Sequence, residues 1–322
     1  MIKIILLLIC ININFSFAST DPWSFIVMSD IHIYPSGKIP EHFKTMVAHV
    51  KDKKPDLVFI TGDHTNGNRG DSHSPKRISY WYQQLDKALT PLFEAGIIVI
   101  PIVGNHDYYE TKHKEAYKVW AQRTLKKSSE TLEVSLNNPV YFNFKYKKQE
   151  FFIFKLWTQV LDSDQKKWFV KASQHLPENF RFGFGHVPLK SVIGRTSTSF
   201  YKTVGELFSK SNIDIYFAGH EHTHWDQLLP FDNLRQITVG TTSGTYNFPL
   251  RRQVRDIHCK NNKVCTMPNS NNSFLIEQRN SKNGYQVYKQ NFVEVIFDSS
   301  KNYQINSYGL ATDSSLVNFY LD

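Results

Sequence analysis

Short apolar runs alternate with amphipathic segments along most of the chain from residue 23 onward. Five of these runs are rich in Ile, Val and Phe and are followed by Gly, Asp or His, a pattern that is typical of buried strands. The five predicted strands are residues 24–28, 56–61, 97–103, 181–185 and 213–218.

Two of the segments between these strands have helical periodicity. In residues 76–89 apolar side chains recur three and four positions apart and form one helix face, and Pro75 stands where a helix can begin. Residues 163–176 have the same spacing, with Ser163 as the expected N-cap. The sequence therefore predicts helices over both segments.

The later part of the chain favours β structure. Residues 140–146 and 150–156 predict a hairpin, and from about residue 234 strands predominate, with residues 286–297 as the longest candidate. Strands with intervening helices, followed by β-rich sequence, predict a layered α/β sandwich.

Residues 1–18 have the features of an export signal. One early lysine is followed by a short apolar run, and Ser16 and Ala18 supply the small residues of a cleavage site. We predict a cleaved signal peptide and a secreted or periplasmic protein without a membrane span after cleavage; an uncleaved membrane anchor is the alternative. Residues 19–322 are expected to form one domain with a β-rich part from about residue 246.

The composition excludes several classes of protein. With 322 residues, 41% of them hydrophobic and 14% aromatic, the chain can build a packed core and is not disordered. Three cysteines exclude a disulfide-dense scaffold; Cys259 and Cys265 are predicted to form a bridge, with two free thiols as the alternative. The net charge is +9, and the basic residues are scattered along the chain, so no specific nucleic-acid site is predicted. The positive electrostatic field of the protein would still attract a small anionic substrate.

Polar residues gather at the carboxyl ends of the five predicted strands. Each end carries Asp, Asn or His, and Gly precedes the key residue in four of them. The motifs are Asp30-Ile31-His32, Gly62-Asp63-His64, Gly104-Asn105-His106-Asp107, Gly185-His186 and Gly219-His220-Glu221-His222. Because the carboxyl ends of strands in an open α/β sheet converge on one crevice, we expect these side chains to meet.

This collection has the chemistry of a metal centre. Carboxylates and neutral imidazoles are the ligands of divalent ions such as Zn²⁺, Mn²⁺ or Fe²⁺. Such a set exceeds the needs of one ion, so the sequence predicts two ions that share a carboxylate, without favouring one metal. The predicted ligands are Asp30, His32, Asp63, Asn105, His186, His220 and His222.

Taken together, the five motifs resemble those of the calcineurin-like metallophosphoesterases, in the family's order and over residues 23–245. The resemblance implies a four-layer αββα sandwich of two mixed β-sheets flanked by helices, with a dinuclear centre at one edge. It also implies phosphoester hydrolysis by a hydroxide that bridges the two ions. The implied ligands of one ion are Asp30, His32 and His222, those of the other are Asn105, His186 and His220, and Asp63 bridges both.

Two residues beside the implied ligands are expected to take part in catalysis. His106 follows Asn105 on extended backbone, where neighbouring side chains alternate in direction, so it is predicted to stay free of metal. It is the candidate general acid for the leaving oxygen. Asp107 is predicted to orient a ligand, with a simple turn carboxylate as the alternative.

Departures from subfamily patterns narrow the expected activity. Asn66 stands where purple acid phosphatases carry a tyrosine ligand, and Asp107 stands where protein Ser/Thr phosphatases carry Glu. This pair is more similar to bacterial-type phosphodiesterases of the cyclic-nucleotide and glycerophosphodiester branch. We therefore predict a phosphodiesterase acting on a small phosphoester; the alternatives are an exported phosphomonoesterase (a nucleotidase or acid phosphatase) and a non-enzymatic metal-binding secreted protein.

Substrate specificity is assigned to three segments that are predicted as loops and insertions. They are residues 64–75, 108–139 and 188–202. Several residues near the motifs are considered as substrate contacts, with packing or a solvated surface as the alternative. They are His64, Tyr108, Tyr109, His224 and the pair Arg251-Arg252.

Overall fold

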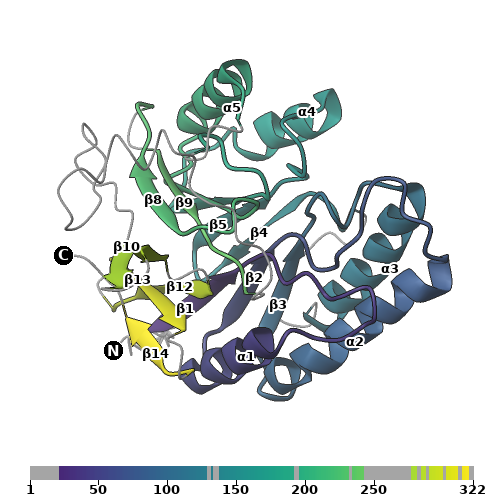
Figure 1. The fold of residues 1–322 in the computed structure, drawn as a ribbon. Helices are drawn as coiled ribbons and strands as arrows, with labels where there is room; N and C mark the ends of the chain where they lie inside the picture. Colours follow the sequence, from purple (N-terminus) through teal and green to yellow (C-terminus); the bar gives the residue numbers. More distant parts are fainter. Residues whose placement is uncertain are drawn as a thin grey trace, which may run out of the picture.

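Two β-sheets with helices on their outer faces make up the protein (Figure 1). The structure, a computed structural model, describes residues 22–128, 132, 138–191, 196–231, 234–242, 277–280, 284–287, 290–299, 302–310 and 314–318. The predicted signal peptide, both cysteines of the predicted bridge and the pair Arg251-Arg252 lie outside the described residues.

The first sheet unites the two ends of the described chain. Its strands are β1 (Trp23–Met28), β2 (Leu57–Thr61), β3 (Ile98–Ile102), β12 (Asn291–Phe297), β13 (Tyr303–Leu310) and β14 (Leu316–Asn318). They lie in the order β14-β13-β12-β1-β2-β3. β1, β2 and β3 are parallel, whereas β12 runs antiparallel to β1. The C-terminal strands therefore complete the sheet that the N-terminal strands begin.

The second sheet is formed by the middle of the chain. Its strands are β4 (Phe142–Tyr146), β5 (Gln149–Ile153), β6 (Arg181–Phe184), β7 (Ile215–Ala218), β8 (Trp225–Leu228) and β9 (Arg235–Thr238). They lie in the order β4-β5-β6-β7-β9-β8, with β5, β6, β7 and β9 parallel. A separate antiparallel ribbon pairs β10 (Glu277–Asn280) with β11 (Gly284–Val287).

Five described helices complete the layers. They are α1 (Glu41–Lys53), α2 (Pro75–Glu94), α3 (Thr111–Ser128), α4 (Ser163–Ala172) and α5 (Thr198–Lys210). The first three share a buried cluster with one face of the first sheet, and α4 and α5 share another with the second sheet. This arrangement confirms the predicted four-layer αββα sandwich.

The layer between the sheets is rich in phenylalanine. Because side chains alternate along a strand, Phe25 and Val27 of β1 face the second sheet while Ile26 and Met28 face the helices. Phe59 of β2 stacks on Phe184 of β6, with ring centroids 4.0 Å apart and an interplanar angle of 11°. This aromatic contact joins two of the strands that lead into the predicted motifs.

Some predicted boundaries are wrong. The predicted strand 286–297 is divided between β11 and β12, which pair with different neighbours. The N-cap of α4 is Asp162 rather than Ser163, since its carboxylate accepts a hydrogen bond from Gln165 N at 2.9 Å.

Two of the segments predicted as loops and insertions are in part helical. Most of the described part of 108–139 is α3, and α5 begins within 188–202.

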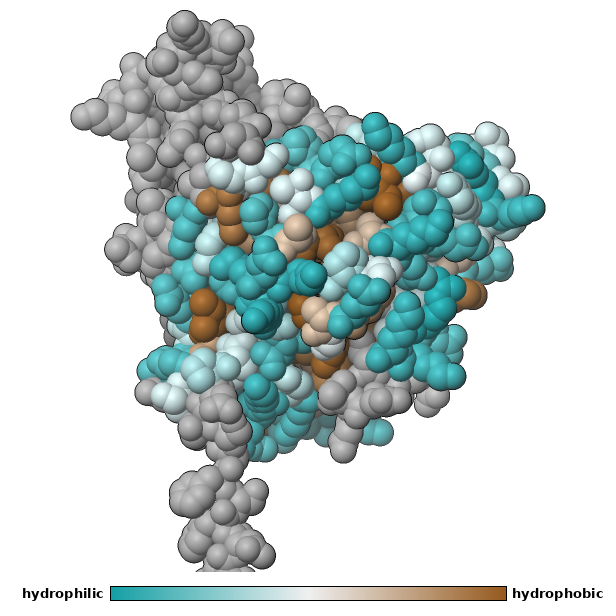
Figure 2. Space-filling model, turned by 90° about the horizontal axis from the view of Figure 1, so that it is seen from below, coloured by the Kyte–Doolittle hydropathy of each residue, from teal (hydrophilic) through white to brown (hydrophobic). Residues whose placement is uncertain are grey.

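The helices that cover the first sheet are amphipathic. Seen from below in Figure 2, the side on which α1 and α2 lie is mainly hydrophilic, with small separate hydrophobic areas.

Candidate metal centre

The predicted ligands lie in short loops directly after β1, β2, β3, β6 and β7, at the carboxyl ends of these strands. Five of the seven have a positive φ between 49° and 73°, a range that non-glycine residues seldom adopt. The five are Asp30, His32, Asp63, His220 and His222. Strain of this kind persists only where the surrounding structure enforces it, and it concentrates at functional sites.

Two glycines let these loops come close together. Gly62 has a φ of 97°, and a Cβ there would lie 2.4 Å from Nδ1 of His186. A Cβ on Gly104 would lie 2.1 Å from the backbone nitrogen of Asp63. A larger residue at either position would push apart the loops that carry the ligands.

The first group of ligand atoms comes from the loops after β1 and β7. Nε2 of His32 and Nε2 of His222 lie 3.1 Å apart, and Oδ1 of Asp30 lies 3.1 Å from the His222 nitrogen. All three side chains are buried. Two imidazole nitrogens that face each other beside a carboxylate provide the donor atoms that a divalent cation needs.

The second group comes from the loops after β3, β6 and β7. Oδ1 of Asn105 lies 2.9 Å from Nε2 of His186 and 2.9 Å from Nδ1 of His220. The two imidazole nitrogens are 3.3 Å apart. Three donor atoms thus converge on one point, as they do in the first group.

Asp63 belongs to both groups. Its Oδ2 lies 3.2 Å from Nε2 of His186 and 3.7 Å from Nε2 of His32. Asp30, His32, Asp63 and His222 have ligand atoms within 4.8 Å of one another, and so do Asp63, His186 and His220. The structure therefore brings all seven predicted ligands together in two clusters that share one carboxylate.

Hydrogen bonding and local charge at the two clusters suit the binding of cations. Nδ1 of His186 lies 2.7 Å from the carbonyl oxygen of Thr61, so a proton on Nδ1 leaves the lone pair of Nε2 directed at the cluster. Burial lowers the pKa of His32, which favours its neutral form. Burial opposes a charged His186, but the carboxylates of Asp63 and Asp30 outweigh it and raise its pKa to about 9. The cluster thus attracts positive charge.

The loop after β9 holds the first group in place. Oγ1 of Thr241 donates to the carbonyl oxygen of Asp30 at 2.7 Å, and Oγ1 of Thr242 donates to that of Ser29 at 3.0 Å. Oγ of Ser29 donates to Oδ2 of Asp30 at 2.5 Å, and the backbone nitrogen of His220 donates to the same oxygen at 2.9 Å. One oxygen of Asp30 is therefore fixed by the protein while the other faces the ligand cluster.

His106 lies beside the centre but in neither cluster. Its Nε2 is 3.9 Å from Oδ2 of Asp63, and its backbone nitrogen donates to Oδ1 of Asp63 at 2.9 Å. About a fifth of the side chain is exposed, in contrast to the nearly inaccessible Asp63. The imidazole is thus anchored at the backbone and open to solvent on one side.

Asp107 points away from the ligands. Its buried carboxylate accepts hydrogen bonds from the backbone nitrogens of His64, Thr65 and Gly104, from Nδ1 of His64, and from Oη of Tyr82 at 3.0 Å. Among the described residues, no hydrogen bond joins this carboxylate to the side chain of a predicted ligand. Asp107 ties the loop after β2 to the loop after β3, so it positions ligands through the backbone.

Several further residues near the motifs have a place in the fold. His64 is buried against Trp120, and His224 is buried with its Nε2 3.2 Å from Oγ of Ser307. Tyr108 is also buried, whereas Tyr109 is only partly covered and bonds to a ligand: Nδ2 of Asn105 donates to its Oη at 2.6 Å. The prediction did not include this bond, although the spacing of four residues through a turn is visible in the sequence.

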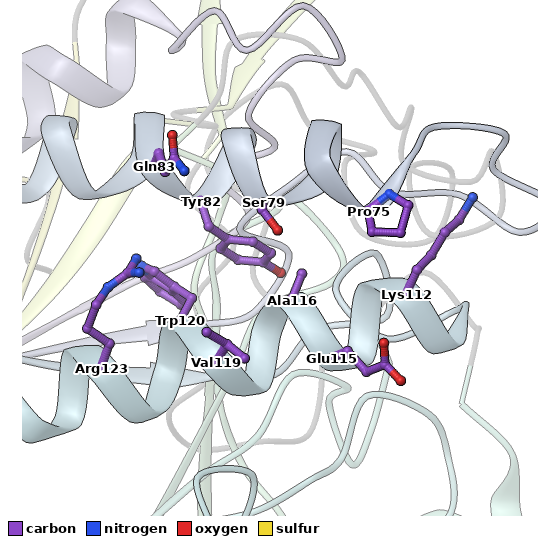
Figure 3. Close-up of a pocket in the computed structure, with 10 residues that line it drawn as sticks. All are labelled: Pro75, Ser79, Tyr82, Gln83, Lys112, Glu115, Ala116, Val119, Trp120 and Arg123. Carbon is purple, nitrogen blue, oxygen red and sulfur yellow. The ribbon is translucent and has the colours of Figure 1, made fainter.

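A cavity of about 220 Å³ lies between α2 and α3 and is distinct from the centre (Figure 3). Tyr82 and Trp120 extend into it from the two helices, and polar side chains such as Lys112 and Glu115 surround it. None of the predicted ligands lines it.

Within the described part of the chain, no helix combines the length and the apolar character needed to cross a membrane.

Comparisons with solved structures show related folds. A purple acid phosphatase, PPD1, from yellow lupin (Lupinus luteus) seeds has a TM-score of 0.60 at 13% identity, covering 93% of this chain. This chain spans only 53% of the lupin protein. GAP50, the anchor in the inner membrane complex of Plasmodium, has a TM-score of 0.55 at 11% identity, with 94% and 89% coverage of the two chains.

A third similar structure is a dimetal phosphatase from Danio rerio. It has a TM-score of 0.50 at 12% identity and covers 70% of this chain and 90% of its own. At such identities these likenesses show the fold alone. No protein of curated function matches the chain in sequence.

The family is established by sequence. The family model described as calcineurin-like phosphoesterase matches residues 24–224, more than half of the chain, and this range includes all five motifs. The family that the motifs predict is thereby confirmed. The chain belongs to the calcineurin-like phosphoesterase family.

Proposed function

We propose that this phosphoester hydrolase cleaves a small phosphodiester at a centre of two divalent ions. The observation that carries the proposal is the pair of clusters joined by Asp63. A single shared carboxylate between two sets of donor atoms suits two neighbouring ions, which is the arrangement used for in-line displacement at phosphorus.

Each cluster would hold one ion. When bound, divalent ions supply an activated water and neutralise the charge that develops on the phosphoryl oxygens. The residues of the first cluster are Asp30, His32 and His222, those of the second are Asn105, His186 and His220, and Asp63 serves both. The candidate metals are Mn, Fe and Zn, because all three accept imidazole and carboxylate ligands.

His106 is proposed to protonate the leaving oxygen. It is outside both clusters and partly exposed, and its backbone is fixed to Asp63. A side chain that binds no metal keeps a transferable proton, and general acids of this kind contribute about 10²–10⁴-fold to a rate.

The preference for a diester rests on the resemblance of Asn66 and Asp107 to the phosphodiesterase branch. The test is hydrolysis of bis-p-nitrophenyl phosphate and of p-nitrophenyl phosphate by the purified protein with added Mn²⁺. Faster turnover of the diester supports the proposal. Faster turnover of the monoester favours a phosphomonoesterase, and bound metal without hydrolysis of either compound indicates a binding protein.

Export is a second part of the proposal. It is supported by the apolar run in residues 1–18 and by the small residues at the expected cleavage site. N-terminal sequencing of the protein produced in its native host should begin at Ser19. A mature protein that still begins at Met1 would show that the segment is an uncleaved anchor.

A further inference from the structure

The side-chain amide of Asn105 is held at both ends. Its oxygen faces the nitrogens of His186 and His220, at 2.9 Å from each. Its nitrogen donates to Oη of Tyr109 at 2.6 Å. The amide therefore spans the gap between the second cluster and a tyrosine that binds no ion in the proposed assignment.

The direction of this amide decides whether Asn105 can serve as a ligand. The oxygen carries the lone pairs, whereas the NH₂ group can only donate hydrogen bonds. An amide that rotates freely presents its oxygen to the cluster for only part of the time. A hydrogen bond to the NH₂ end keeps the oxygen directed at the histidines, as second-shell bonds do for other metal ligands.

Tyr109 is well placed to give this support because its ring is held from several sides. The guanidinium of Arg69 lies 5.2 Å above the ring centroid. The rings of His106 and Trp157 approach it edge-on, at centroid distances of 5.4 and 6.3 Å. A turn closed by the hydrogen bond from Tyr108 N to the carbonyl oxygen of Asn105 brings the tyrosine back to the ligand.

The neighbouring Tyr108 differs in this respect. Its ring is buried against Trp157 and Tyr117, and no hydrogen bond joins it to a ligand among the described residues. The chain thus offers two adjacent tyrosines in one turn, of which one bonds to a ligand.

We propose that Tyr109 is a positioning residue that fixes the amide of Asn105 and thereby sets the affinity of the second cluster for its ion. The proposal rests on the dinuclear centre described under the proposed function. It assigns to Tyr109 no contact with the ion and no step in the reaction. Removal of a second-shell partner typically costs about 10–100-fold in metal affinity, and we expect an effect of this size.

The test is calorimetric titration of the metal-free full-length protein with Mn²⁺. Two binding events are expected for the wild type. The event that weakens most in Asn105→Ala belongs to the second cluster. In Tyr109→Phe this event should weaken by about 10–100-fold, while the other changes by less than about twofold. Tyr108→Phe, which removes the same hydroxyl one residue away, should leave both events unchanged.

A double-mutant cycle separates positioning from a general structural effect, provided that Asn105→Ala weakens the second event without abolishing it. In the Asn105→Ala background, Tyr109→Phe should then cause no further loss of Mn²⁺ affinity, because the group it supports is absent. Unchanged affinities in Tyr109→Phe would overturn the inference, as would equal weakening of both events or an additive loss in the cycle. Failure of the wild type to bind two Mn²⁺ ions would overturn the proposed centre itself.

Discussion

The two ligand clusters differ in charge and in the way they are held. The first has a carboxylate of its own, Asp30, and is fixed by hydroxyl groups from the loop after β9. Among the described residues the second has no carboxylate of its own and shares Asp63 with the first. Its amide ligand depends on a tyrosine hydroxyl for its direction. We therefore expect the first cluster to bind its ion more tightly and the second to exchange its ion more readily.

The largest effect is expected where the two clusters meet. Asp63→Ala removes the shared carboxylate and leaves the second cluster without negative charge, so both ions should be lost and hydrolysis should fall to background. Elemental analysis after gel filtration measures the metal content, with the exposed Asp52→Ala as the control. Full occupancy by two ions in Asp63→Ala would rule out the shared-ligand assignment.

The next largest effect concerns a residue in neither cluster. His106→Asn should keep both ions and still cleave bis-p-nitrophenyl phosphate, whose leaving group scarcely needs a proton. The rate at which the variant hydrolyses an alkyl diester should fall by about 10²–10⁴-fold, because the leaving oxygen of that substrate is strongly basic.

Rates on the two substrates and metal content are measured for His106→Asn beside His42→Asn, an exposed histidine on α1. Equal losses on both substrates would point to phosphate positioning instead. Loss of one ion would show that His106 is a ligand.

A third test concerns the loops that carry Asp63 and Asn105. Asp107→Asn replaces a buried carboxylate that accepts hydrogen bonds from several donors, and it should lower the free energy of unfolding by about 1.5–3 kcal/mol. Burial raises the pKa of this carboxyl, but His64 and the backbone donor of Gly104 outweigh burial and leave it below the usual value.

The pH dependence of that test follows from the lowered pKa. A carboxyl whose pKa is lowered by folding stabilises the folded state at a pH above its pKa in the unfolded chain, which is about 4. This contribution is lost as the pH falls through the pKa of the folded state. In urea unfolding of the metal-free protein, the difference in the free energy of unfolding between wild type and Asp107→Asn should therefore become smaller below about pH 4. A difference in the free energy of unfolding that stays constant with pH would mean that the charge of Asp107 does not contribute to stability.

The smallest effect is expected for a substitution that makes the two clusters more alike in charge. Asn105→Asp gives the second cluster a carboxylate of its own, and ligand charge raises the affinity for a divalent ion. We expect about tenfold tighter Mn²⁺ binding at the weaker event, measured by competition with a chelator. Weaker binding would indicate that the neutral amide is needed there, for instance because Tyr109 holds only the amide form well.

The ligands could be predicted from the sequence because each stands at a strand end with a glycine or a second ligand beside it. Five apolar runs located the strands, and the parallel order of β1, β2 and β3 brings Asp30, Asp63 and Asn105 to one edge. The family match confirms the identity of the motifs. The individual role of each ligand stays a prediction.

Other features depend on tertiary contacts that local patterns do not reveal. The helix α3 is rich in lysine, and its apolar side is carried by a few residues such as Tyr117 and Trp120, so the sequence does not indicate a helix there. The strand prediction 286–297 is right at its end, Phe297, but it joins β12, which pairs with β1, to β11, which pairs with β10. The sequence predicts that Asp107 orients a ligand, but it does not reveal the hydrogen-bond partners of this carboxylate, because His64 and Tyr82 are remote in the sequence.

The antiparallel pairing of β1 with β12 has a consequence for the order of folding. Trp23 at the start of β1 lies opposite Phe297 at the end of β12, so the strand that leads into Asp30 and His32 gains one of its two neighbours only after the chain has been synthesised as far as Phe297. Such long-range pairing makes folding slow and leaves an unpaired strand edge exposed in the nascent chain. The loop that carries Asp30 and His32 is therefore expected to reach its final structure late. A chain truncated before β12 would have an open edge on β1, the strand that leads into these two residues.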